Sequence, residues 1–221
     1  MDNKLFDEII ASKLGFLKVD GYSFRGVDRN VWFEKNTESA GFRIGFAYTE
    51  YGQIFHIKGL KASKRFNEIE NVLQKVLGGN LVDYYTVYIS PNEREISPGL
   101  LYKKTENNFH FEIANADDLY LFLKFVESFY EKIHSFYNSY ETLSQVYDKI
   151  KELSKEHLSR FVSNSNNLLF ARVYLVKSCC DKSEGEAYFS EIDKELNKMR
   201  GNKTIESISD ILNSVKRRIE I

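Results

Sequence analysis

The chain has little cysteine and little proline: two of each among 221 residues. The cysteines, Cys179 and Cys180, are neighbours, and adjacent cysteines rarely form a disulfide with each other because the geometry is strained. A reducing, cytoplasmic compartment is therefore expected. Few prolines, together with only 12 glycines, also argue against long disordered linkers.

No long apolar run is present. Residues 1–14 are charged and amphipathic, so we expect no secretory signal there, and no stretch approaches the length that a bilayer span requires. Charge of one sign is not in excess either. Lys plus Arg against Asp plus Glu count 15 and 15 for residues 1–115, then 16 and 17 for residues 116–221. The sequence therefore predicts neither membrane association nor a nucleic-acid partner.

Recognisable catalytic and metal-binding motifs are missing as well. None of the four histidines has a second histidine or a cysteine at the spacing of metal ligands. The sequence has no glycine-rich phosphate loop followed by lysine, and no nucleophile elbow. We accordingly expect no metal site and no cofactor.

Hydrophobic spacing indicates the secondary structure. Before residue 114 most apolar residues alternate, which is typical of half-buried strands. We predict strands around 31–33, 42–48, 54–57, 84–89, 100–103 and 109–113. Helical spacing predicts two helices in the same region, over residues 5–14 and 64–77. Ser63 would cap the second helix, and Gly78-Gly79 would end it.

Near Ile113 the spacing changes to every third or fourth residue and stays there. We predict that Asn115 is the N-cap of the first helix in this region. Residues 168–180 are apolar nearly all round, which indicates a buried helix. We predict an α+β protein with two parts. Residues 1–114 form an antiparallel sheet with two helices, and residues 115–221 form an array of about five helices. The join lacks a flexible linker, so we expect the helical part to pack closely on the first.

Aromatic residues make up 14% of the chain, and some of them are candidates for a binding surface. Tyr and Trp are enriched at protein interfaces, which favours a patch formed by Trp32, Tyr48, Tyr51, Tyr84 and Tyr88. The alternative is that these rings stack across strands and complete the sheet.

Three short segments also resemble a family. They are Phe6-Asp7-Glu8-Ile9-Ile10, Leu14-Gly15-Phe16 and Tyr22-Ser23-Phe24-Arg25. They resemble the start of a group of uncharacterised bacterial domains, in which an amphipathic helix runs into antiparallel strands. The likeness covers about the first 60 residues and a helical tail around residues 168–176. Some members resemble immunity proteins that neutralise toxins, so the resemblance implies a small cytoplasmic protein that binds another protein.

Two functions remain open at this point. The first is a non-enzymatic protein-interaction module, with toxin antagonism as one form of it and a helical interaction array as a compatible variant. The second is a hydrolase-like enzyme whose site is assembled from distant residues. That site would centre on His56 and His110, with Glu112 or Glu34 as the orienting carboxylate.

Overall fold

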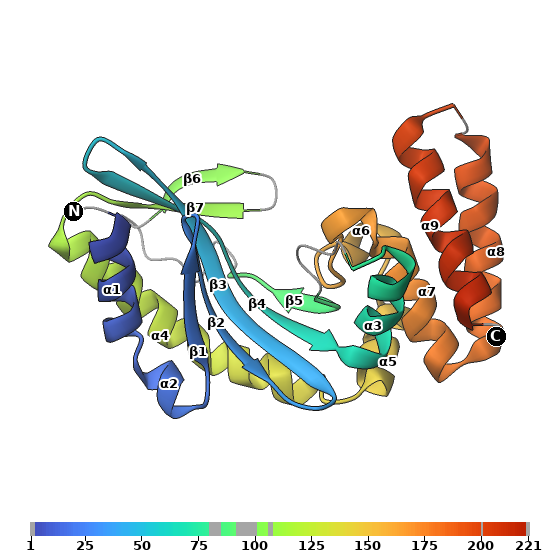
Figure 1. Ribbon diagram of the computed structural model, residues 1–221, viewed down its shortest axis with the longest axis horizontal. Coiled ribbons are helices and arrows are strands. Elements are labelled where there is room, and N and C mark those ends of the chain that lie inside the picture. Colours follow the sequence, from blue (N-terminus) through green and yellow to red (C-terminus); the bar gives the residue numbers. More distant parts are fainter. Residues whose placement is uncertain (1–2, 80–84, 92–100, 106–107, 200, 220–221) are drawn as a thin grey trace. The chain divides into compact units, whose positions relative to one another are not determined.

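The computed structural model describes residues 3–79, 85–91, 101–105, 108–199 and 201–219. It has a sheet with helices in the N-terminal half and a run of about five helices after it, which confirms the predicted α+β class (Figure 1). The chain divides into two compact units that interleave along the sequence. Unit 1 comprises residues 1–37, 41–63 and 89–137, and unit 2 comprises residues 38–40, 64–88 and 138–221.

The predicted boundary between residues 114 and 115 differs from this partition. Residues 116–137 belong with the first unit, and residues 64–88 belong with the second. The two sequence-defined domains, and the close packing expected between them, stay a prediction.

Seven strands form one sheet in the described residues, in the order β1-β2-β3-β4-β7-β6, with β5 also pairing with β4. Each strand that the alternating pattern predicted overlaps one of these. The bounds are β1 (Ser23–Val27), β2 (Asn30–Asn36), β3 (Ala40–Tyr51), β4 (Ile54–Phe66), β5 (Val87–Ile89), β6 (Leu101–Thr105) and β7 (Asn108–Ile113).

The turn between β1 and β2 contains only Asp28 and Arg29. Both residues have positive φ, at 50° and 64°, which is the backbone of the two-residue turn that suits the twist of a hairpin. Asn30 donates a hydrogen bond from its side chain to the carbonyl oxygen of Asp28 at 3.0 Å. This tight turn fixes the register in which Arg25 lies opposite Trp32.

One face of the sheet in unit 1, which we call the inner face, is covered by helices. The ring of Phe6 on α1 (Asn3–Lys13) stacks on Phe55 with ring centroids 4.4 Å apart. Phe122 on α4 (Ala116–Ser139) packs edge-on against Phe46 at 5.3 Å and contacts Phe111 at 5.4 Å. A short helix that the sequence did not predict, α2 (Phe16–Val19), follows α1. We call the opposite face of these strands the outer face.

The start of α4 is capped as predicted. The side-chain oxygen of Asn115 accepts hydrogen bonds from the backbone N–H groups of Asp117 and Asp118, at 2.9 and 3.0 Å. Such bonds satisfy donors that have no partner inside the helix.

The predicted helix over residues 64–77 starts later than expected. Strand β4 continues to Phe66, and α3 (Asn67–Val76) follows, so Ser63 lies in a strand and is not a cap. Gly59, with a φ of 63°, interrupts the alternation, and Leu60 and Ala62 are then buried after it. The predicted stop is confirmed, because Gly78 and Gly79 both have positive φ and the N–H of Gly79 bonds to the carbonyl of Gln74.

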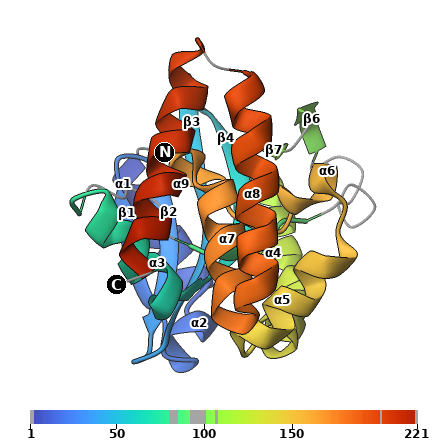
Figure 2. The same cartoon turned by 90° about the vertical axis from the view of Figure 1, so that its right-hand side faces the viewer.

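Unit 2 is largely helical, and α7 (Leu169–Cys180) is its central helix. All residues from 171 to 176 are buried, as the apolar pattern predicted. Helix α7 packs against α3, α5, α8 and α9, and Figure 2 shows α8 and α9 running alongside it. The remaining bounds are α5 (Leu143–Glu152), α6 (Lys155–Leu158), a 3-10 turn at Ser165–Asn167, α8 (Lys182–Lys198) and α9 (Lys203–Ile219).

A small polar cluster ties the end of α2 to α4 within unit 1. The hydroxyl of Tyr130 donates a hydrogen bond to the carboxylate of Asp20, and Nε2 of His134 lies 3.7 Å from the same carboxylate oxygen. The side chain of Lys35 donates to the backbone carbonyl of Asp20 at 2.9 Å. The hydrogen bond from Tyr130 and the positive charges nearby lower the pKa of Asp20 below its ordinary value.

The lowered pKa of Asp20 predicts a dependence of stability on pH. Because the folded pKa lies below the unfolded value of 3.8, the stabilisation is present above pH 3.8 and is lost as the pH falls through the folded pKa. Asp20→Asn should therefore remove part of the acid-induced loss of stability, measured as the free energy of urea unfolding from pH 2 to pH 6.

Asp7 provides a control, because its pKa is shifted in the opposite direction to that of Asp20. Desolvation raises the pKa of Asp7, against a smaller lowering effect of its hydrogen bond with Tyr48. Ionisation of Asp7 therefore costs stability as the pH rises above 3.8. Asp7→Asn should remove that cost and steepen the net loss of stability toward acid. Identical pH profiles for the two variants would contradict the assignment.

Candidate binding surface

Trp32 lies on the outer face of the sheet, on β2, next to the edge strand β1. Its register partners are Arg25 on β1 and Gly45 on β3. A Cβ atom on Gly45 would lie 2.7 Å from the carbonyl oxygen of Val31 and 2.9 Å from Cβ of Trp32. Only glycine therefore allows β2 and β3 to approach this closely beside the indole.

Two arginines surround the indole ring of Trp32. The guanidinium carbon of Arg43 is 4.7 Å from the ring centroid, and that of Arg25 is 6.0 Å from it. Both distances fall within the range of cation–π attraction. Glu34 holds Arg43 in place, with Oε1 at 2.6 Å from Nη2 and 2.8 Å from Nε. The ion pair therefore orients the cation that stacks on Trp32.

The indole N–H of Trp32 is buried and has no hydrogen-bond partner among the described residues. A buried donor without an acceptor costs about 1–3 kcal/mol. The outer face thus holds an aromatic ring, two cations and an unsatisfied donor within a few strands.

Tyr51 adds a second aromatic side chain to the outer face. It is 67% exposed, at the end of β3, and its ring centroid lies 5.4 Å from that of His56. His56 in turn lies opposite Glu112 on β7, and Lys58 lies opposite His110. Trp32 and Tyr51 are therefore the two predicted binding residues that share this face.

Tyr48 does not belong to the exposed patch predicted for it. It is only 2% exposed and packs on Phe6 with ring centroids 4.8 Å apart. Its hydroxyl donates a hydrogen bond to Asp7 at 3.0 Å, and burial raises the pKa of Tyr48. The reason is its position in the alternation, because Tyr48 shares the inner face with Ile44 and Phe46.

The two other predicted residues do not join this surface. Tyr84 lies outside the described residues. Tyr88 belongs to unit 2, where its hydroxyl donates to the carbonyl of Ser159 at 2.6 Å and its backbone N–H bonds to Phe161. Tyr88 therefore anchors β5 to the loop before α7.

Two carboxylates were proposed for the alternative site around His56, and one of them lies next to His56. Glu112 lies directly opposite His56 in the sheet. Glu34 lies on β2, which β3 separates from β4, and it is engaged by Arg43. The hydrolase-like site stays a prediction, with Glu112 as the carboxylate next to His56.

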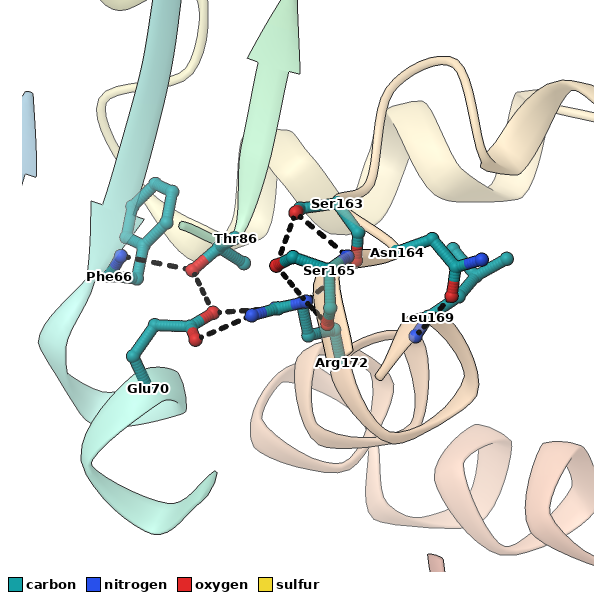
Figure 3. Close-up of polar contacts among 8 residues, drawn as sticks. All are labelled: Phe66, Glu70, Thr86, Ser163, Asn164, Ser165, Leu169 and Arg172. Carbon is teal, nitrogen blue, oxygen red and sulfur yellow. Dashed lines mark hydrogen bonds and ion pairs between the residues drawn. The ribbon is translucent and has the colours of Figure 1, made fainter. Parts of the chain in front are cut away.

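Unit 2 contains a buried polar network that the sequence did not predict (Figure 3). Glu70 on α3 and Arg172 on α7 form a two-pronged ion pair, with Nε–Oε1 at 2.9 Å and Nη2–Oε2 at 3.0 Å. Both side chains are 0% exposed. Arg172 is the single charged residue in the buried stretch 171–176.

The rest of the network satisfies the remaining polar groups. Thr86 donates its hydroxyl hydrogen to Glu70 at 2.9 Å and accepts from the backbone N–H of Phe66 at 3.1 Å. Nη1 of Arg172 donates to the carbonyl oxygens of Ser163 and Ser165, at 2.8 and 3.1 Å. Because these groups are buried and bonded to one another, the network holds α3, β5 and α7 together and is closed to a ligand.

The function of these surfaces has to be inferred from their chemistry. No protein-family model, curated protein or solved structure matches the chain. In the described part of the chain, no three His, Cys, Asp or Glu side chains gather as they would around a metal ion. Over the same residues, every helix is too short or too polar to cross a membrane.

Proposed function

We propose that the protein is a non-enzymatic interaction module that binds another protein through the outer face of the sheet in unit 1. The observation that carries the proposal is the arrangement of Arg25 and Arg43 around Trp32. Trp, Tyr and Arg are the residues that most often dominate the binding energy of protein interfaces. Trp32 and the two arginines lie together on this face, and Tyr51 is exposed on the same face further along β3, six residues beyond Gly45, the residue opposite Trp32.

The distribution of aromatic residues supports the same proposal. The rings of Phe6, Tyr48, Phe55 and Phe122 are buried against the inner face, where they have a structural role. Trp32 and Tyr51 lie on the outer face and take no part in this packing. Among the described residues of unit 1, α1 and α4 pack on the other face, which leaves Trp32 on the face where a partner can contact it.

Toxin antagonism is the form of this function that the family resemblance favours. An antagonist of this kind would act in the cytoplasm, and the two free cysteines suit a reducing compartment. If a gene next to the coding sequence specifies a toxin, co-expression should restore growth of cells that make it. Trp32→Ala should abolish that rescue.

A photo-crosslinking experiment tests the proposed surface directly. A photoreactive phenylalanine analogue replaces Tyr51 in the full chain, which is then irradiated in the native host. We expect one dominant crosslinked protein, and we expect Trp32→Ala to abolish that product. The same analogue in place of Tyr120 is the matched control, because Tyr120 is 60% exposed but lies on α4, on the other side of the sheet.

Equal crosslinking from positions 51 and 120 would indicate random encounters and would contradict the proposal. So would a product at position 51 that persists in the Trp32→Ala variant. The variant's far-ultraviolet circular dichroism and its urea midpoint establish that unit 1 remains folded in each comparison.

A further inference from the structure

The outer edge of β1 has no partner strand in the part of the chain that the structure describes, because β1 ends the strand order. Four of its five residues are exposed, including Val27 at 43%. An unpaired edge presents a row of backbone N–H and C=O groups that can pair with another extended chain. Proteins commonly bind peptide segments by adding a strand to such an edge.

On the outer face, the side chain that β1 itself presents is a cation, whereas the carboxylates nearby belong to Asp28 in the turn and to Asp7, which lies against Gly26. Arg25 is exposed at the middle of β1, and Arg29 is exposed in the turn that follows. Arg43 lies two strands further into the outer face and is paired with Glu34, whereas among the described residues Arg25 and Arg29 form no ion pair. A segment lying along β1 would therefore place its outer-face side chains next to the guanidinium group of Arg25.

From this edge and its charges, and resting on the proposed function, we propose that the partner contributes an extended acidic segment that adds to the sheet as a strand beside β1. Its backbone would pair with Ser23–Val27, and its carboxylates on the outer face would lie next to Arg25. Opposite charges on adjacent strands stabilise a sheet, and like charges destabilise it.

Two other occupants of the edge are disfavoured. If two copies of β1 paired antiparallel about their centres, Arg25 of one copy would lie directly opposite Arg25 of the other, which is destabilising. A nucleic acid cannot form the ladder of backbone hydrogen bonds that a strand edge offers.

The test uses the full chain and a synthetic peptide of alternating Glu and Val. Trp32 is the only tryptophan, so its fluorescence reports binding at this surface, and the anisotropy of a dye on the peptide gives a second measurement. The same peptide with Lys in place of Glu is the charge control. A third peptide carries N-methyl groups on alternate amides, which prevents strand pairing along one edge.

We expect saturable binding of the acidic peptide alone. Arg25→Glu should raise its Kd by about tenfold, because charge reversal replaces an attraction by a repulsion. The matched variant Lys194→Glu, an exposed helical position in unit 2, should leave the Kd unchanged.

Several results would overturn the inference. They are failure of the acidic peptide to bind, equal binding of the lysine or N-methylated peptide, and an unchanged Kd in Arg25→Glu. Binding of single-stranded DNA in place of the peptide would assign the edge to nucleic acid. Dimerisation that Arg25→Glu abolishes would assign it to a second copy. A crosslinked partner that requires Trp32 but not Arg25 would retain the proposed function while removing the added strand.

Discussion

Replacing Glu70 by glutamine, or Arg172 by methionine, is expected to lower the free energy of unfolding by about 3–5 kcal/mol. Each single change leaves the other partner with unsatisfied polar atoms in a fully buried site. The Glu70→Gln variant is the harsher test of charge, because the guanidinium of Arg172 then remains buried without an anion. Urea unfolding followed by far-ultraviolet circular dichroism measures the effect.

The double variant Glu70→Leu with Arg172→Met should be more stable than either single variant. An apolar pair of similar volume often replaces a buried ion pair without a large penalty. Thr86 and the carbonyl of Ser163 would still lose partners, so we expect recovery to be partial.

A surface ion pair provides the control for this network. Lys149 and Glu152 are 3.0 Å apart with side chains 38% and 69% exposed. Glu152→Gln should cost less than about 1 kcal/mol, because exposed pairs contribute little. Single variants of the buried pair that cost no more than Glu152→Gln would refute the role assigned to Glu70 and Arg172.

Truncation of Phe6 to alanine should destabilise unit 1 by about 3–5 kcal/mol. The ring is 0% exposed and contacts the rings of Phe55 and Tyr48. Removing it deletes apolar contacts and leaves a cavity between α1 and the inner face. The fluorescence of Trp32, which lies in unit 1, follows this unfolding transition.

The residue before Phe6 separates burial from helix propensity. Leu5 occupies the same helical turn but is 47% exposed, so Leu5→Ala should change stability by no more than about 0.5 kcal/mol. Phe6→Leu, which retains much of the apolar volume, should cost clearly less than Phe6→Ala. Equal effects at positions 5 and 6 would contradict the packing described for α1.

The fold class was predictable because hydrophobic spacing is a local property. The alternation of apolar residues before Ile113 was enough to predict the sheet. The helical spacing after Asn115 was enough to predict α4 and the buried helix α7. The start of α3 was not predictable in the same way. Gly59 shifts the alternation by one position, so the end of β4 resembles the beginning of a helix when only the side-chain pattern is considered.

The candidate site was predictable only in part. Tyr48 was assigned to an exposed patch although its own strand pattern placed it on the apolar face with Phe46, and the pattern was the better guide. The ion pair between Glu70 and Arg172 spans 102 residues, which no local pattern reveals. One signal was present, a lone arginine inside an apolar helix, since such a charge requires a buried partner.

The distance in sequence between Glu70 and Arg172 also has a consequence during synthesis of the chain. At about 5–20 residues per second, ribosomes need about 5–20 s to add the 102 residues between Glu70 and Arg172. During that time Glu70 on α3 has been synthesised and its partner Arg172 on α7 has not. The carboxylate of Glu70 and the apolar face of α3 therefore exist for several seconds before the helix that pairs with them has been made.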